Sequence, residues 1–232
     1  MIKALLPALF SASDYNKYCN EKFSEAFNLI DLKINENANI LTSYYACADE
    51  ECGFIDAKVS HDVFHGDTLV MFISGENNNV LPRDFKKILE ASDHSGEINL
   101  IAGYKIWQNG DPLKYRISHL QGETFINLIS ISGTHHIVDA KGRINNSCSD
   151  IEIVTPRAYT KNGGYILSAF AYDENNIKVK EDQNVLASIH SGRMGLSVGV
   201  ASTDGGMSKR MKAISEAKCG GLDDIAFCIA FD

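Results

Sequence analysis

The chain has 232 residues, of which 44% are apolar and 22% are charged, and its formal net charge is −8. This length and apolar content are enough for one large or two small folded domains, and the moderate charge excludes a disordered chain. The acidic balance and the lack of a basic cluster argue against nucleic acid as a partner. No apolar run approaches the ~18 residues of a membrane-spanning helix, so we expect no membrane insertion.

The first residues, MIKALLPALFSAS, contain one lysine and a short apolar run that Pro7 interrupts. Because the cleavage consensus is poor, we expect no cleaved signal peptide. The six cysteines are too sparse for the disulfide scaffold of a small secreted domain. We therefore expect synthesis in a reducing, intracellular compartment, with Cys228 as a buried thiol in the apolar run IAFCIAF.

The elements in chain order begin with a predicted helix over residues 13–30, where Ser13 or Asp14 is the N-cap and the apolar residues fall roughly on one face. A second candidate, residues 81–92, fits either a short helix or a brief strand. The rest of the chain shows short apolar runs, rich in Ile, Val, Phe and Tyr, between polar turns. The clearest predicted strands are 66–74, 98–107, 125–132, 164–172, 194–202 and 222–231. Many short strands with regular turns predict an all-β sandwich or barrel.

These strands recur in the same order along the chain. GDTLVMFIS (66–74) matches GGYILSAFAYD (163–173) at an offset of 97 residues, and the strands that begin at 98 and 195 have the same offset. The segments KYRIS (114–118) and MKAIS (211–215) are also 97 apart, and INLISIS (126–132) and IAFCIAF (225–231) are 99 apart. Four collinear pairs indicate an internal duplication, with pseudo-repeats over 66–132 and 163–231.

A unit of four strands cannot bury a face alone, so we expect two units to stack face to face around a shared core. The predicted fold is an antiparallel β-sandwich of the jelly-roll or immunoglobulin-like class over residues 40–232, built from two duplicated halves. Gly66 and Gly163 mark the sharp start of equivalent strands. Residues 133–162 are expected to link the halves, with the polar stretch 133–150 as a long surface crossing. Residues 1–39 are expected to form a short helical or irregular extension.

The order of these pieces resembles a β-sandwich module of bacteriophage virion proteins and bacterial surface proteins. That module has a Gly-Asp and an apolar strand, a Pro with an aromatic, a strand that ends near a Tyr or Arg, and a Pro-x-x-Tyr strand. The matching pieces here are GDTLVMFIS, LPRDF, INLIAGYKIW and DPLKYRIS, then FINLISISGTH, with NGGYILSAFAYD as the Gly-led strand of a second half. Where the module commonly has Gly-Trp after the proline, this chain has Asp84-Phe85.

The resemblance covers about residues 40–232 and implies a non-enzymatic virion subunit, such as a head-decoration, tail-tip or tail-fibre protein. It implies a homo-oligomer that docks on other virion subunits, is made in the host cytoplasm and needs no cofactor. Residues 1–39 lie outside the resemblance and are expected to attach the sandwich to a neighbouring subunit through a helix or an added strand. The alternatives are a lectin-like adhesin or receptor-binding module for a host-surface glycan, and a glycan depolymerase with paired carboxylates in a cleft.

One set of residues has the ligand types of a tetrahedral zinc site: Cys47, Cys52, His61 and His65. The gap between the two pairs is shorter than in a zinc finger, and no helix is predicted around the histidines. We therefore favour a cysteine-bearing turn beside a solvated strand, and we keep zinc and a Cys47–Cys52 disulfide as alternatives.

The remaining polar and aromatic groups favour structural roles, and we predict no catalytic residue. His135 and His136 point apart in an extended segment, and we assign them to a surface loop. The acidic pairs at 49–51, 181–182 and 223–224 are interpreted as solvent-facing or turn residues, and STDGGMSK (202–209) as a hairpin turn. Four aromatic residues would stack on sugars if exposed, but a core position is their commoner role: Tyr104, Trp107, Tyr115 and Phe125.

Overall fold

The computed structural model describes most of the chain, and every regular element in it is a β-strand. The described residues are 24–26, 32–35, 38–47, 54–76, 80–118, 122–145, 152–173, 177–179, 184–190, 194–215 and 224–232. The strands pair in antiparallel fashion, so the all-β prediction is confirmed. The described residues contain no candidate transmembrane helix.

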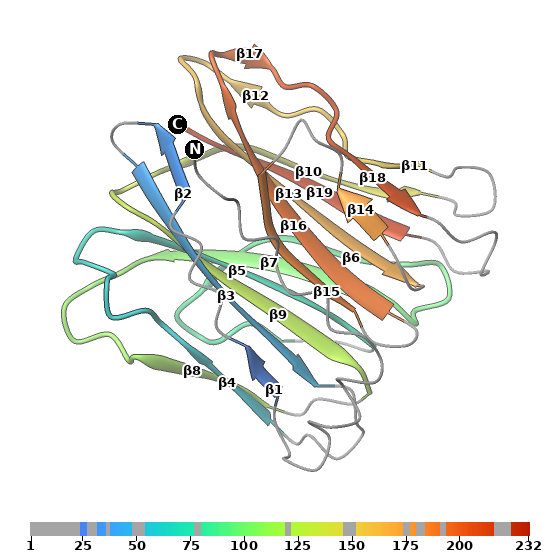
Figure 1. Ribbon diagram of the computed structural model, residues 1–232, viewed down its shortest axis with the longest axis horizontal. Helices are drawn as coiled ribbons and strands as arrows, with labels where there is room; N and C mark the ends of the chain where they lie inside the picture. Colours follow the sequence, from blue (N-terminus) through green and yellow to red (C-terminus); the bar gives the residue numbers. More distant parts are fainter. Residues whose placement is uncertain are drawn as a thin grey trace, which may run out of the picture.

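Two large sheets form the centre of the molecule (Figure 1). The first sheet has the strand order β1-β3-β9-β5-β7-β6, and β2 also pairs with β3. Its strands are β1 (Ser24–Ala26), β2 (Leu32–Asn35), β3 (Ala38–Cys47), β5 (Thr68–Gly75), β6 (Lys86–Ser92), β7 (Asn99–Ile106) and β9 (Thr124–Ile131). The second sheet has the order β10-β19-β13-β16-β15. Its strands are β10 (Ile137–Asn145), β13 (Gly164–Asp173), β15 (Asn184–His190), β16 (Met194–Thr203) and β19 (Asp224–Phe231).

Three small sheets lie outside the two large ones (Figure 1). One pairs β4 (Phe54–Lys58) with β8 (Lys114–Ser118), at the lower left of the figure. On the opposite side, the second has the order β11-β18-β14 and the third pairs β12 with β17. Their strands are β11 (Glu152–Val154), β14 (Ile177–Val179), β18 (Lys212–Ser215), β12 (Tyr159–Thr160) and β17 (Gly206–Met207).

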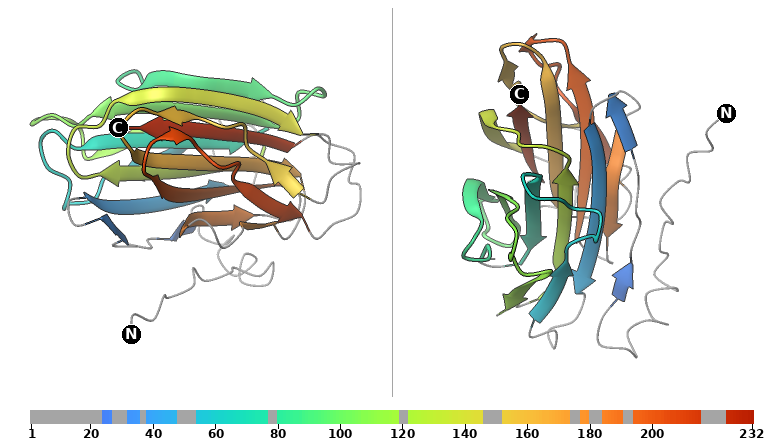
Figure 2. Two further views of the ribbon diagram at one scale, coloured as in Figure 1. Left: turned by 90° about the horizontal axis from the view of Figure 1, so that it is seen from above. Right: turned by 90° about the vertical axis from the view of Figure 1, so that its left-hand side faces the viewer.

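The two large sheets pack face to face around one shared core, as the sequence predicted. Val70 and Phe72 of the first sheet belong to the same buried cluster as Leu167 and Leu196 of the second. In the left view of Figure 2 the strands of both sheets run roughly along the long axis of the molecule, as in an aligned β-sandwich.

The outer faces of both large sheets are covered as well, so the molecule has four layers. Under β4 and β8 the first sheet buries Leu69 and Met71, and under the small sheets on the other side the second sheet buries Ile166 and Phe170. As a result, β5, β9 and β19 are buried at every position. Burial on both faces explains why these strands are continuous apolar runs rather than alternating patterns.

The strand order repeats between the two large sheets. The series β3-β9-β5-β7-β6 corresponds to β10-β19-β13-β16-β15, and the pair β4-β8 corresponds to β11-β18. The edge strands β6 and β15 also carry a bulge at the same place, with Ile88 and Leu186 as the extra residues. The same order and the same bulge agree with two duplicated halves.

The predicted offsets between equivalent strands are wrong by one residue in places. Val70 and Leu167 are 97 residues apart, but their cross-strand partners Ile129 and Ile229 are 100 apart, not 99. In β7 and β16 the register gives an offset of 96, which matches Leu100 with Leu196 in the shared core. A slip of one residue in a strand moves every side chain to the other face of the sheet. An offset of 97 would therefore match the core-facing residues of β7 with outward-facing residues of β16.

The two halves contact each other reciprocally. β3, which lies next to the short edge strands β1 and β2 of the first sheet, packs on β15, and β6, at the opposite edge, packs on β10. Because β3 is equivalent to β10 and β6 to β15, each contact occurs twice, as in an isologous dimer.

The two segments considered for a helix contain strands, which for residues 81–92 is the brief strand that the sequence left as an alternative. Residues 86–92 form β6, which pairs with β7 and packs Leu89 and Ala91 against the shared core. Within 13–30, residues 24–26 form β1, and the other residues of that prediction lie outside the described residues. Pairing with a neighbouring strand overrides local helix propensity at both places.

The predicted link at 133–162, with a surface crossing over 133–150, is also wrong. This segment contains β10, β11 and β12, which belong to the second half, and the link between the halves is the short bend before β10. β10 escaped prediction because it is an edge strand with exposed polar residues such as Lys141 and Arg143.

Candidate functional site

The Gly66-Asp67 motif ties the first half to the link between the halves. Gly66 has a φ of +95°, a conformation that favours glycine. The buried carboxylate of Asp67 accepts a hydrogen bond from the Gly133 amide at 2.7 Å. The Thr68 hydroxyl donates to the Gly133 carbonyl at 3.0 Å and accepts from the His135 amide at 2.8 Å. The motif therefore has a structural role at the junction.

The adjacent histidines do not converge on one site, and the predicted loop is confirmed. The His135 ring packs edge-on against Tyr165, with centroids 5.4 Å apart, and its Nδ1 lies 2.9 Å from the backbone oxygen of Asp232. His136 is exposed, and its amide donates to the Asp232 carboxylate at 3.1 Å. The Asp139 carboxylate instead forms an ion pair with a lysine of its own strand.

Lys105 is a cation with a largely buried side chain, and its role was not expected from the sequence. Its side chain is 9% exposed, its Nζ lies 2.8 Å from Asp111, and the ring centroids of Tyr115 and Trp107 are 5.4 and 5.9 Å away. Burial favours a lower pKa for Lys105, but the nearby Asp111 carboxylate outweighs it and raises the pKa. The one sequence signal was a lysine inside an apolar strand. Lys105 holds the turn after β7 in place.

An open pocket of about 340 Å³ lies on the outer face of the first sheet, beside the end of β4. Three of its apolar side chains come from β3, β5 and β9, and the fourth follows β4: Leu41, Leu69, Leu128 and Val59. Polar side chains also line the pocket: Thr42, Ser43, Ser60, Ser130, Lys58 and His61. An apolar surface with a hydroxyl-rich rim suits a small ligand that has both apolar and polar faces.

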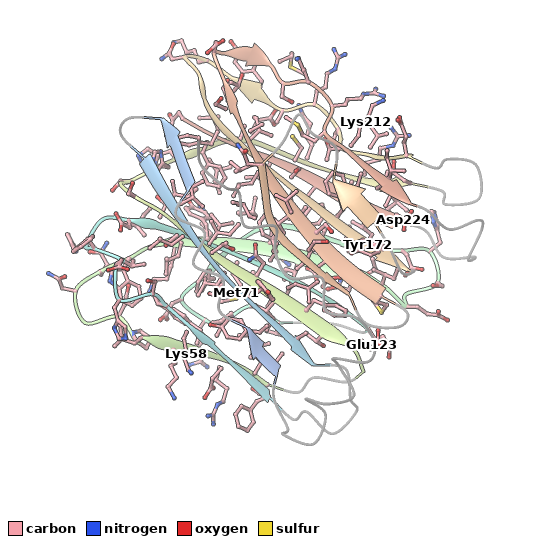
Figure 3. All side chains as sticks on the ribbon, viewed as in Figure 1. Lys58, Met71, Glu123, Tyr172, Lys212 and Asp224 are labelled. Carbon is pink, nitrogen blue, oxygen red and sulfur yellow. The ribbon has the colours of Figure 1, made fainter. Side chains whose placement is uncertain are left out.

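Side-chain hydroxyls of β3 position the wall of this pocket. The Tyr45 hydroxyl accepts a hydrogen bond from the Lys58 amide at 2.7 Å and donates to the Lys58 carbonyl at 3.1 Å. The Ser43 hydroxyl donates to the same carbonyl at 3.4 Å. These bonds satisfy the free edge of β4 at Lys58, which Figure 3 labels in the outer layer.

The candidate zinc ligands are only partly described. His61 and His65 lie on exposed turns between β4 and β5, and His61 also lines the pocket. Cys47 ends β3, but its side chain and all of Cys52 lie outside the description. The described residues contain no cluster of three metal-ligating side chains. Zinc and the Cys47–Cys52 disulfide therefore stay predictions.

Three of the four candidate sugar-stacking residues are core residues. Trp107, Tyr115 and Phe125 are 6%, 3% and 0% exposed, which confirms the structural interpretation for them. Tyr104 is half-buried at the end of β7, with Lys86 Nζ 5.9 Å from its ring centroid. Among the four, only Tyr104 has surface to offer a ligand.

Only some of the other predicted turn residues lie within the described residues. Of the acidic pairs, only Asp224 is described, and it is the buried first residue of β19 rather than part of the preceding turn (Figure 3). Asp204 and Gly205 form a bend between β16 and β17, which do not pair, so the predicted hairpin is wrong.

Cys228 is a buried thiol, as the sequence predicted. It lies in the cluster under the outer small sheets, and burial raises its pKa to about 11. The neutral thiol form therefore dominates at neutral pH, which suits packing and not nucleophilic chemistry.

The outer surface of β4 and β8 is basic. Arg116 binds both carboxylate oxygens of Asp56, at 2.7 and 2.9 Å, and its guanidinium lies 3.9 Å from the ring centroid of Phe54. Lys114 Nζ lies 3.8 Å from the same carboxylate. The hydrogen bond from Arg116 holds the pKa of Asp56 below its usual value. Together with Lys58, the cations of this surface outnumber its one carboxylate.

No protein-family model, curated protein or solved structure matches the chain. Function is therefore inferred from the architecture and from the contacts of the described residues.

Proposed function

We propose that the protein is a non-enzymatic structural protein of a phage or prophage virion, a head-decoration, tail or fibre subunit that acts by docking and self-association. The observation that carries this proposal is that buried charged side chains hold turns and the link between the halves in place. Asp67 binds the link between the halves, Lys105 holds the turn after β7, and Asp93 accepts the Ile98 amide at 2.9 Å in the turn before β7. Buried charges with these roles support a scaffold of constant shape.

The sheet edges support controlled docking. The edge strands β6, β10 and β15 each carry a bulge, and β1 and β2 pair along the remaining edge at β3. Bulges at sheet edges oppose unspecific strand pairing. Such protection suits a subunit that is present at high local concentration in an assembly and associates only through specific surfaces. The resemblance to virion β-sandwich modules favours the same role.

Immunoelectron microscopy tests this proposal. Particles from cells that carry the neighbouring genes are labelled with an antibody against the chain, and particles from cells lacking this gene are the control. We expect label on a capsid face or on the tail, and light scattering of the purified protein should show a homo-oligomer. Protein that stays soluble and leaves the particles unlabelled would overturn the proposal.

The pocket beside β4 favours a second candidate function, carbohydrate binding. Its serine hydroxyls can exchange hydrogen bonds with sugar hydroxyls while the leucines contact the apolar sugar face. A glycan array with the variant Ser60→Trp, which narrows the pocket, tests it. The matched control is Ser202→Trp, at an exposed serine of β16 outside the pocket. Binding that Ser60→Trp alone removes would support this function, and an array without hits would reject it.

A further inference from the structure

Within the described residues, the outer edge of β8 carries no paired strand. The Val59 amide donates to the Leu113 carbonyl at 2.9 Å, so Leu113 and Tyr115 direct their backbone groups toward β4. The intervening residues, Lys114 and Arg116, therefore direct their N–H and C=O groups away from β4. Among the strands that the structure describes, none pairs with this edge of β8.

The equivalent edge in the second half is occupied. The Thr155 amide donates to the Met211 carbonyl at 2.9 Å, the same bond that starts the β4-β8 ladder. Counting from this bond, Ile214 is equivalent to Arg116. The backbone of Ile214 pairs with Lys178 of β14, which adds a third strand to that small sheet. The fold thus accepts a strand at the position that is open beside β8.

The first half uses its own corresponding segment differently. Residues 80–82 follow β5 much as β14 follows β13, but they form no strand. The Leu81 side chain packs against Gly103 of β7, and the Phe85 amide donates to the Pro82 carbonyl at 2.9 Å. Pro82 also lacks the N–H that a pairing strand needs.

The positive charge of β8 indicates which kind of strand would pair with this edge. Lys114 and Arg116 are 59% and 58% exposed and lie on the solvent face of β8. A second copy of β8 paired antiparallel at this edge would place these cations against their own copies, which is unfavourable. Acidic side chains at the same places would form cross-strand pairs.

We propose that the outer edge of β8 binds an extended acidic segment of a partner protein as an added antiparallel strand, in the position that β14 holds in the second half. Backbone hydrogen bonds to Lys114 and Arg116 hold the segment, and its alternate carboxylates face their side chains. This deepens the docking role proposed above, but its test needs no virion. A failed peptide titration therefore leaves the virion proposal standing, and unlabelled particles leave this one standing.

The test uses the full chain labelled with ¹⁵N and two peptides, acetyl-Glu-Val-Glu-Val-Glu-Val-Glu-amide and the same peptide with Lys in place of Glu. We expect the acidic peptide to shift the amide signals of Lys114 and Arg116 and to bind about ten-fold more tightly than the basic one. Arg116→Pro removes an outward N–H without touching the β4 ladder and should abolish binding. Arg116→Thr keeps the N–H and should retain part of the affinity.

Thermal unfolding first establishes that each variant is folded. If Arg116→Pro does not fold, Lys114→Glu replaces it in the test. This variant should bind the acidic peptide more weakly and the basic peptide more tightly than the unchanged protein does. Acidic-peptide shifts confined to other strands, or unchanged binding by Arg116→Pro, would overturn the proposal. A dimer of the free protein that Arg116→Pro dissociates would also overturn it, in favour of self-pairing.

Discussion

At the residue scale, Gly164 shows how closely β13 starts beside the end of β19. Its φ is +142°, and a Cβ atom there would lie 1.9 Å from the backbone oxygen of Phe231. A backbone oxygen in a paired strand cannot move aside as a flexible side chain could. The requirement for glycine is therefore steric as well as conformational.

We expect Gly164→Ala to lower the free energy of unfolding by about 3 kcal/mol or more, because it combines overpacking with a strained φ. Gly96→Ala is the matched control: Gly96 also has a positive φ, +77°, but nothing lies within 4 Å of its added Cβ. That variant should lose only about 1 kcal/mol. Urea unfolding measures both, and equal losses would contradict the steric account.

The pair of Lys105 and Asp111 gives a pH prediction at the same scale. Burial favours a higher pKa for Asp111, but Lys105 and the Gln108 amide outweigh it and hold the pKa below its usual value. The folded state therefore binds this proton less tightly than the unfolded state. The stabilisation is present above the unfolded pKa and is lost as the pH falls through the folded pKa.

Asp111→Asn should accordingly cost more free energy of unfolding at pH 6 than at pH 3. Asp84→Asn is the control, since Asp84 is 54% exposed and lies 3.8 Å from the same ammonium, and its effect should be small at both values. Denaturant unfolding at the two pH values measures the difference. A cost for Asp111→Asn that does not change with pH would refute the pairing.

At the element scale, β1 and β2 close the edge of the ten-residue strand β3. We expect deletion of residues 1–35 to leave the protein folded, because the described shared core begins at Ile40. The opened edge of β3 should then promote self-association. Light scattering and thermal unfolding measure both effects.

Deletion of residues 1–23 is the matched control, since it keeps both strands, and it should leave the oligomeric state unchanged. If the protein without residues 1–35 no longer folds, the N-terminal strands are part of the core. If the protein without residues 1–35 folds and its self-association is unchanged, the edge of β3 does not need β1 and β2 to prevent self-association.

At the scale of the whole molecule, each half exposes the apolar face that the other half covers. We expect fragments 1–135 and 136–232 to be unfolded alone and to assemble when expressed together, because the shared core has residues from both. Co-purification through a tag on one fragment, followed by circular dichroism, measures this. A fragment that folds alone as a monomer would contradict the shared core.

Leu196→Asp should abolish the assembly of the fragments, because it places a charge in the shared core. Ser202→Asp, at an exposed position of the same strand, is the control and should assemble normally. If both variants assembled equally well, the face-to-face packing would be wrong.

The fold class, the central strands and their repeated order could be predicted from the amino-acid sequence. Strands such as β5 and β19 are buried on both faces, so local composition alone marks them as apolar runs. The Gly66-Asp67 motif was recognisable for a similar reason, because a backbone that requires glycine is a local property.

The register, the edge strands and the sites depend on contacts between distant segments and could not be predicted from local sequence. Whether Leu100 matches Leu196 depends on pairing across the sheet, and β6 and β10 are strands because a neighbour accepts them at an edge. Lys105, the pocket and the open edge of β8 arise where segments far apart in sequence meet. Such contacts leave no period or motif in the local sequence, because the energy that selects them comes from distant partners.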